Sequence, residues 1–266
     1  MNDKNNPFET FGIEKLSPSS INTYISSPAK WLLTYLYGYR DNGSPAMWRG
    51  NVVDNAVGAY FGKIKNQKKR KSLTLVQEEA LQGLDYYKKE CKSAGGEIDD
   101  NKYEKEKSLI PQFISNAVDH YSNLEEEIET YQEEVYFEDP DLPVPIRGFL
   151  DLKYKDVVRD IKTTGVTKSA NTEAIKRQVS MYAYVTDRIA IVDYIYCTKY
   201  KSEVISVPIY DVKENVEVLK RGALAIMNFL SISDDKNDLA KLVIPDFDDW
   251  KWSDGDINEA KQIWRI

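Results

Sequence analysis

Cysteine and histidine are scarce in this 266-residue chain, which contains two of the former and one of the latter. Cys91 and Cys197 lie far apart and lack the close spacing of thiolate metal sites, so we expect two reduced thiols of a cytosolic protein. The single histidine, His120, falls in a predicted helix, where we expect a structural or exposed role. The sequence therefore argues against a cysteine-rich metal site.

Long apolar runs and an excess of positive charge are also absent. No segment approaches the 18 or so apolar residues that span a bilayer, and the first ten residues lack the apolar stretch of a signal peptide. The net charge is −7, because 36 Lys and Arg residues stand against 43 Asp and Glu residues. This argues against a protein that coats nucleic acid by charge alone, but it does not exclude an enzyme that engages nucleic acid through a local basic surface and metal ions.

What is present is a change of pattern along the chain. Helical patterns prevail to about residue 128, at 17–40 (two short helices), 46–62, 73–92 and 102–127. From about 129 to 232 we predict strands at 130–138, 146–154, 157–163, 190–198 and 203–210, with helices at 171–187 and 212–231. An acidic tail follows, at about 233–266. Because no Pro-, Gly- or Ser-rich linker divides these parts, we predict one composite α/β domain, 1–266, with a helical N-terminal half.

Two aspartates mark the centre of the predicted hairpin. A two-residue turn at Lys155-Asp156 would place Asp151 directly opposite Asp160, with their Cβ atoms about 4.5–5.5 Å apart. Strand alternation then puts Lys162 on the face of Asp160. Three apolar residues fall on the other face and are expected in a core: Leu150, Leu152 and Ile161.

Opposed carboxylates on neighbouring strands repel each other unless something compensates their charge. A divalent cation would do so, since carboxylate oxygens are natural ligands of Mg²⁺ and Mn²⁺. The alternative is two exposed strand aspartates with nearby Lys and Arg as counterions. These three residues alone leave both interpretations open.

Five elements in a fixed order extend this pattern beyond the hairpin. They are LSPSSINTYISSPAKWLLTYLYGY, RGNVVDNAV, GFLDL, VVRDIKTTG and RQVSMYAY. In these elements the chain resembles the PD-(D/E)xK nuclease superfamily, in particular its RecB-like exonuclease branch, from about Leu16 to Thr198. The resemblance implies a restriction-endonuclease-like fold, in which a central mixed sheet is flanked by helices.

The resemblance also implies roles for individual residues. Asp151 and Asp160 would be metal ligands, with the Ile161 carbonyl as a further oxygen ligand. Lys162 would orient the attacking water and balance negative charge in the transition state. Metal-assisted phosphodiester hydrolysis needs these residue types, because it requires an activated water and neutralisation of the charge on phosphorus.

Other residues are implied less directly. Gln178 and Tyr182 would line the site and help to position the DNA. Glu134 begins the preceding strand, where the family often has a supporting glutamate. It is one of several acids in that segment, however, so an exposed solvated charge is an equal alternative.

Two positions depart from the family's pattern. Asp54 stands where many relatives carry histidine. As a metal ligand it would supply a carboxylate oxygen and suit Mg²⁺. The alternative to a ligand is an aspartate in the first turn of a helix, where the helix dipole stabilises its charge. Ser27 stands where relatives with an iron–sulfur cluster carry a cysteine. Two cysteines cannot form a four-thiolate site, so no cluster is expected.

Three further features leave alternatives open. Six positive charges occur close together without an intervening acid, and they either contact the DNA backbone or belong to a solvated loop: Lys63, Lys65, Lys68, Lys69, Arg70 and Lys71. The aromatic residues of Tyr24–Tyr39 could stack on bases, although such spacing more often indicates core. The acidic tail could bind a partner or pack against the domain.

We therefore predict a DNA nuclease that depends on Mg²⁺ or Mn²⁺. The branch resemblance adds that it is an exonuclease of recombination, repair or phage DNA processing, in the cytoplasm of a bacterial or phage-infected cell. DNA is the expected partner, with a recombinase, a single-strand-binding protein or a helicase as candidate protein partners, and no membrane partner is expected.

Two other functions are kept as alternatives. The chain could be a non-catalytic nucleic-acid-binding or assembly module of the same fold. The intact set of Asp151, Asp160, Lys162 and Gln178 argues against this. It could also be a nuclease subunit that acts only beside a helicase or recombinase, because the helicase motif G-x-x-x-x-G-K-[ST] does not occur.

Overall fold

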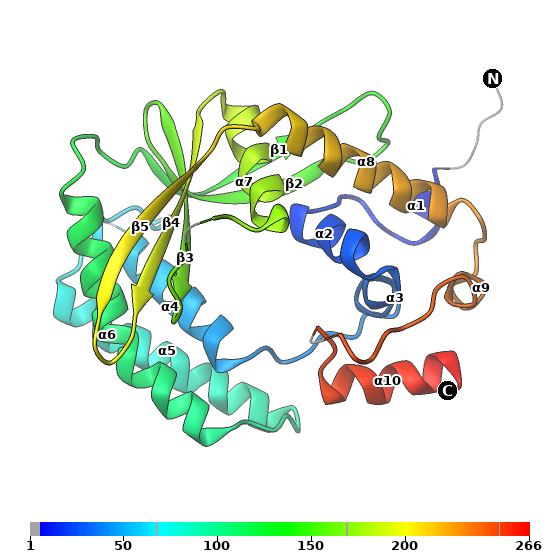
Figure 1. Cartoon of the computed structure of the whole chain (residues 1–266), viewed down its shortest axis with the longest axis horizontal. Coiled ribbons are helices and arrows are strands. Elements are labelled where there is room, and N and C mark those ends of the chain that lie inside the picture. The colour runs from blue at the N-terminus through cyan, green and yellow to red at the C-terminus, as the bar shows by residue number, and fades with distance from the viewer. Residues whose placement is uncertain (1–5, 68, 169, 250) are drawn as a thin grey trace.

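A five-stranded mixed sheet forms the centre of the protein (Figure 1). The computed structural model describes residues 6–67, 69–168, 170–249 and 251–266. The strands lie in sequence order in the sheet: β1 (Thr130–Phe137), β2 (Ile146–Lys153), β3 (Val157–Thr164), β4 (Ile189–Cys197) and β5 (Ser202–Ile209). Neighbouring strands are antiparallel, except for the parallel pair β3 and β4. A parallel pair needs a crossover, and helix α7 (Glu173–Thr186) provides it.

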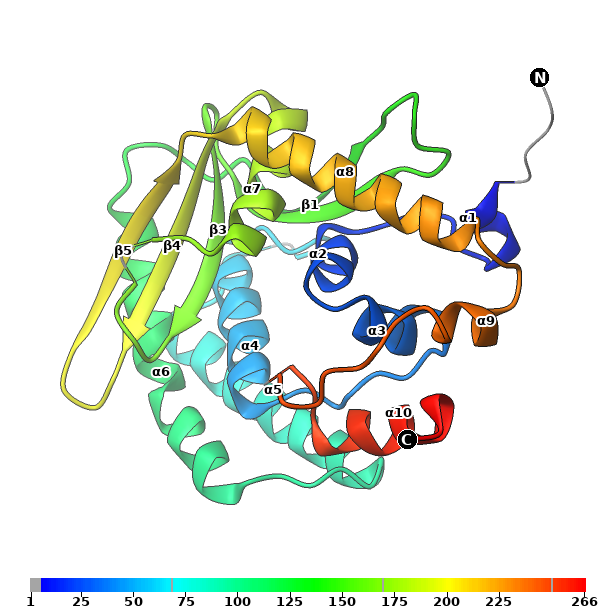
Figure 2. The same ribbon diagram turned by 45° about the vertical axis from the view of Figure 1, so that its right-hand side comes forward.

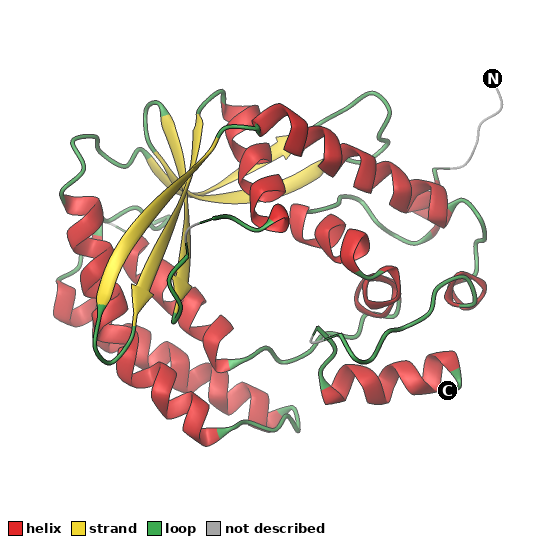
Figure 3. Cartoon of the chain, viewed as in Figure 1, coloured by secondary structure: helices red, strands yellow, loops and turns green. Residues whose placement is uncertain are grey.

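Helices precede the sheet, separate β3 from β4 and follow the last strand (Figure 3). The N-terminal half contains α1 (Pro7–Thr10), α2 (Pro18–Ser26), α3 (Pro28–Trp31), the π-helical turn η1 (Leu32–Leu36), α4 (Pro45–Tyr60), α5 (Leu73–Ser93) and α6 (Asp100–Ser122). Helices α8 (Val212–Leu230), α9 (Lys236–Ala240) and α10 (Asp254–Trp264) follow β5. This arrangement confirms the predicted mixed sheet, its flanking helices and the helical N-terminal half.

The helices cover the two faces of the sheet separately (Figure 2). Helix α7, with α8 and α2 packed against it, covers one face, where Val158, Val192 and Tyr194 are buried in a common core. Helices α4 and α6 cover the other face, where Ile161 and Ile195 are buried in a second core, and α5 packs against these two helices. The alternation of side chains along β3 and β4 sends successive residues into opposite cores.

The central hairpin has the predicted register between Leu152 and Arg159, but the predicted direct pairing of Asp151 with Asp160 is not part of the ladder. Leu152 pairs with Arg159, and the backbone N–H of Tyr154 donates to the Val157 carbonyl at 2.8 Å. Leu150, Leu152 and Ile161 are all buried, as predicted, but Leu150 packs in the core beside α7 instead of sharing the core of the other two. The β2–β3 ladder begins at Leu152, so the N-terminal part of β2 diverges from β3 and turns towards α7.

The tail after α8 packs against the N-terminal helices. Trp252 and Ala260 are buried with Ala29 and Leu33, and Trp264 Nε1 donates to the Ala240 carbonyl at 2.9 Å. Of the two interpretations of the acidic tail, the packed one therefore agrees with the structure. The aromatic segment Tyr24–Tyr39 also contributes mainly to core.

Two further observations concern the N-terminal half. The hydroxyl of Ser27 caps α3 by accepting the Lys30 N–H at 3.2 Å, so this serine has a structural use. In the part of the chain that the structure describes, no helix is long and apolar enough to cross a membrane.

Candidate active site

Three aspartates from three elements meet where β2 diverges from β3. Gln132 on β1 connects two of them, because its Nε2 donates to Asp54 Oδ2 at 2.8 Å and to Asp151 Oδ1 at 3.0 Å. Lys162 approaches the third, with its Nζ 2.7 Å from Asp160 Oδ2. The structure thus brings together residues separated by more than a hundred positions in the chain.

Asp151 is fixed by a main-chain contact as well as by Gln132. The backbone N–H of Ile161 donates to Asp151 Oδ2 at 2.7 Å. This carboxylate oxygen takes the place of a carbonyl from β2 as the acceptor for β3. The bond holds Asp151 beside Asp160 although the strands diverge here, so the side chains meet without being a directly paired set in the β2–β3 ladder.

Two of the aspartates keep buried oxygens that are not satisfied. Asp160 is 1% exposed, and its Oδ1 has no hydrogen-bond partner among the described residues; the same holds for Asp54 Oδ1. A buried carboxylate oxygen without a partner is costly. In the described parts of the chain, no three acidic, histidine or cysteine side chains converge into a ready-made metal cage. Together, Gln132 and Lys162 contact one oxygen of each of the three aspartates.

The pKa values reflect this crowding. Burial raises the pKa of Asp54 to about 6, and the charge of Asp160 adds to the rise against the hydrogen bonds of Tyr131 and Gln132. Burial, followed by the charges of Asp54 and Asp160, raises the pKa of Asp151 well above its usual range. Burial would lower the pKa of Lys162, but Asp160 and Asp151 outweigh it and the pKa is raised. Lys162 therefore stays charged and offsets part of the negative charge.

Gln178 and Tyr182 approach the site from α7. They lie one helical turn apart, and Gln178 Nε2 donates to the Tyr182 hydroxyl at 3.1 Å. Burial, with the charges of Asp160 and Asp151, raises the pKa of Tyr182. Gly148 on β2 makes the approach of α7 possible: a Cβ there would lie 2.3 Å from Tyr182 Cε1. Gly148 of the GFLDL element is therefore needed to make room for Tyr182 of the RQVSMYAY element.

Asp54 lies in the middle of α4, not in its first turn. The interpretation of Asp54 as a helix-dipole aspartate is therefore wrong, because the dipole effect is confined to the terminal turns. Its Oδ2 accepts from the Tyr131 hydroxyl at 2.9 Å as well as from Gln132. Gly58, one turn later, lets the Tyr131 ring approach, since a Cβ there would lie 2.6 Å from Cε1.

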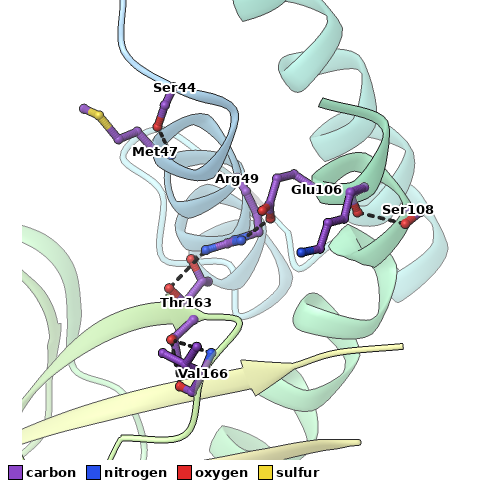
Figure 4. Close-up of polar contacts among 9 residues, drawn as sticks. Ser44, Met47, Arg49, Glu106, Ser108, Thr163 and Val166 are labelled. Atoms are coloured by element: carbon purple, nitrogen blue, oxygen red, sulfur yellow. Dashed lines mark hydrogen bonds and ion pairs between the residues drawn. The ribbon is translucent and has the colours of Figure 1, made fainter. Parts of the chain in front are cut away.

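A buried arginine joins α4 to the end of β3 (Figure 4). Arg49 Nε donates to Thr163 Oγ1 at 3.2 Å, and Nη2 donates to the Thr163 carbonyl at 3.1 Å. The same guanidinium forms an ion pair with Glu106 on α6 and lies 4.7 Å from the centre of the Phe113 ring. Because Thr163 follows Lys162, Arg49 fixes the strand that carries the lysine.

Glu134 lies outside this group of residues. It is exposed, and its Oε1 accepts from the Tyr136 hydroxyl at 2.8 Å and from Arg147 at 3.1 Å. Gln132, two positions earlier, reaches the aspartates instead. Gln132 has a left-handed backbone, with φ of 51°, and this conformation aims its amide between Asp54 and Asp151.

The basic run is partly neutralised by nearby acids. Lys71 Nζ contacts Glu79 at 2.7 Å, and Arg70 and Lys63 share a cavity with Glu125–Glu127. Lys65 and Lys69 are exposed, and Lys68 lies outside the described residues. Contact of this run with DNA stays a prediction.

Comparisons with known proteins agree with this architecture. A crystal structure named "Putative exonuclease" from Eubacterium rectale superposes with a TM-score of 0.55 at 14% identity, covering 97% of this chain and 92% of that one. The crystal structure of SSO0001 matches at 16% identity, covering 66% of this chain and 85% of that one, and its TM-score of 0.29 is too low to support the fold. No curated protein matches the sequence significantly. The model of the PD-(D/E)XK nuclease superfamily matches residues 15–221, and this chain therefore belongs to that superfamily.

Proposed function

We propose that this protein is a metal-dependent DNA nuclease, and specifically an exonuclease of the RecB-like branch that acts in recombination, repair or phage DNA processing. One observation carries the proposal. Asp151, Asp160 and Lys162 form a largely buried cluster of ionisable side chains, in which a carboxylate oxygen of Asp160 lacks a hydrogen-bond partner among the described residues. A protein gains nothing in stability from such an arrangement, so a ligand is its best explanation.

The donor set suits a hard divalent cation. Asp54, Asp151 and Asp160 would hold Mg²⁺ or Mn²⁺, with the Ile161 carbonyl as a further oxygen ligand. When bound, such a cation supplies an activated water and neutralises charge on the phosphate. Burial and the neighbouring carboxylates raise the pKa values of Asp54 and Asp151, and a bound cation would favour their ionised forms.

The chain's own groups would do the rest of the work. Lys162, held by Asp160, places a fixed positive charge beside the scissile phosphate and orients the attacking water. Gln178 and Tyr182 would position the DNA from α7. The side-chain amide of Gln132 would hold the carboxylates of Asp54 and Asp151 close together by donating a hydrogen bond to each. Because α4 supplies a site residue to the sheet, we propose a single composite domain.

A hydrolysis assay tests the function. Purified protein is incubated with end-labelled linear and circular DNA, single- and double-stranded, in Mg²⁺, in Mn²⁺ and in EDTA. We expect degradation of linear DNA with either metal, none in EDTA, and little action on circles. Absence of hydrolysis in all conditions would refute an autonomous nuclease. Activity that appears only on addition of a helicase or recombinase would favour a dependent subunit.

A further inference from the structure

One side of strands β1 and β2 is partly exposed, and it extends from Asp151 towards the N-terminal end of β2. Arg147, Phe149 and Asp151 share one side of β2, because the residues between them are buried on the other side. Phe149 is 42% exposed, and the Arg147 guanidinium lies 5.0 Å from the centre of its ring. Tyr136, opposite Arg147 on β1, is 47% exposed. At roughly 3.3 Å per residue, Arg147 lies about 13 Å along the strand from Asp151.

A cavity of about 330 Å³ lies at the far end of this path. It is bounded by Arg147, by the segment before α2 and by η1, and that segment is fixed to the sheet where Leu16 bridges Ile146. Three cations and two aromatic rings line this cavity: Lys15, Arg40 and Arg147, with Trp31 and Tyr35. One acid, Glu14, also lines it.

Several polar groups of this cavity contribute little to the fold. Trp31 is 1% exposed, yet its Nε1–H has no hydrogen-bond partner within the described part of the chain. Lys15 and Arg40 form no ion pair with any described residue; the Arg40 guanidinium lies 5.9 Å from the centre of the Tyr35 ring. Arg147 is bonded to Glu134 in a partly exposed pair, 3.1 Å apart, and such a pair contributes little stability.

These features match the chemistry of unpaired nucleotides. Exposed aromatic faces stack on single-stranded bases, and a base pair in a duplex does not offer its face in this way. Lysine and arginine neutralise the phosphates, and a buried indole N–H donates to oxygen acceptors. The position of Phe149 between Asp151 and the cavity puts the stacking surface beside the reacting phosphate.

We propose that the open face of β1–β2 and this cavity form one subsite for a single-stranded segment of the nucleic acid, continuous with the aspartate cluster. The proposal rests on the proposed nuclease function and adds the part of the substrate that is held away from the cut. A base stacks on Phe149. The strand then continues to the cavity, where Arg40 and Lys15 contact its phosphates and Trp31 donates its N–H.

Equilibrium binding in EDTA tests the subsite independently of hydrolysis. The anisotropy of a fluorescein-labelled oligothymidylate is titrated with wild type, Arg40→Ala and Phe149→Ala. Because stacking is worth roughly 1–3 kcal/mol per base, we expect Phe149→Ala to weaken binding about 10-fold. For Arg40→Ala, the slope of log K against log salt should decrease in magnitude by about 0.7, because one phosphate is no longer neutralised by the protein.

Matched controls lie at the β4–β5 turn, on the opposite side of the molecule from α2 (Figure 1). Tyr200 is 90% exposed there and follows Lys199, so Tyr200→Ala and Lys199→Ala remove an aromatic ring and a charge from the surface. Neither should change the affinity. An oligonucleotide with abasic positions should bind wild type more weakly than the intact oligonucleotide does. The affinity of Phe149→Ala should fall less when the bases are removed, because this variant lacks the ring on which a base stacks.

The outcomes separate the subsite from the function. Wild-type affinity and salt slope in Arg40→Ala and Phe149→Ala would overturn the subsite, whether or not the wild type hydrolyses DNA. If Arg40→Ala and Phe149→Ala weaken the binding of blunt duplex DNA as much as that of the single strand, the subsite is not specific for single-stranded nucleic acid. If the two variants weaken binding as expected while the wild type cuts no DNA in Mg²⁺ or Mn²⁺, the subsite stands and the proposed nuclease function fails.

Discussion

Two buried aspartate clusters lie on opposite faces of β3 and β4, and their hydrogen bonding differs. On the face covered by α7, Asp160 keeps an oxygen without a partner among the described residues. On the face covered by α6, Asp193 is 0% exposed and accepts from Arg159 Nη1 at 2.9 and 3.0 Å, with two hydroxyl donors in addition. These donors are Ser206 at 2.6 Å and Tyr121 at 3.1 Å.

The pKa values of the two clusters move in opposite directions. Burial would raise the pKa of Asp193, but His120, Arg159 and Ser206 more than offset it, and the pKa is lowered. At Asp54 and Asp151 burial prevails, and the pKa values are raised. Burial of a carboxylate therefore does not by itself indicate function. A satisfied carboxylate stabilises the fold, whereas an unsatisfied one points to a ligand.

The largest effect is expected from removing the satisfied aspartate. Asp193→Ala leaves Arg159 buried without its counterion, and breaking a buried pair in this way costs about 3–5 kcal/mol. The free energy of unfolding, measured by urea denaturation, should fall by that amount. Asp160→Asn should lower it far less, because the side chain of its partner Lys162 is 32% exposed and can be solvated without the carboxylate. Equal destabilisation by both changes would erase the distinction between the clusters.

The next largest effect concerns catalysis. Asp160→Asn and Lys162→Ala should each lower the rate of DNA hydrolysis on the order of 10²-fold or more, because they remove a metal ligand and a charge beside the phosphate. Asp193→Asn serves as the control and should keep its rate per folded molecule. Wild-type rates in both site variants would show that this cluster is not catalytic.

Asp54 is expected to have a smaller effect. Asp54→Ala should raise the metal concentration needed for half-maximal activity roughly 10-fold, while its Tm changes little. Asp54→His should shift the preference from Mg²⁺ towards Mn²⁺, because it replaces an oxygen ligand by nitrogen. An unchanged metal titration for Asp54→Ala would remove Asp54 from the ligand set.

The smallest effect is in the pH dependence of stability. The pKa of Asp193 is lower in the folded protein than in the unfolded chain, so its contribution is complete above the unfolded value of about 3.9 and is lost as the pH falls through the folded value. The difference in unfolding free energy between wild type and Asp193→Asn should therefore shrink below about pH 4. A difference that stays constant down to pH 2 would contradict the ion pair.

The sequence predicted the hairpin and the common side of Asp160 and Lys162, because strand alternation is a local property. It did not predict the divergence of β2 from β3, where Asp151 is held beside Asp160 by the Ile161 N–H instead of by direct pairing. The amide of Gln132 was missed, since its left-handed backbone has no simple signature in the sequence. The link from Arg49 to Thr163 joins segments 114 positions apart, which no local pattern reports.

Metal titration calorimetry tests the contrast between the clusters most directly. Mn²⁺ is titrated into the apo-protein as wild type, as Asp160→Asn and as Asp193→Asn, each shown to be folded by circular dichroism. We expect saturable binding to wild type and to Asp193→Asn, and loss of that binding in Asp160→Asn. Binding of Mn²⁺ to Asp160→Asn with wild-type affinity, or no binding to the wild type, would contradict this expectation.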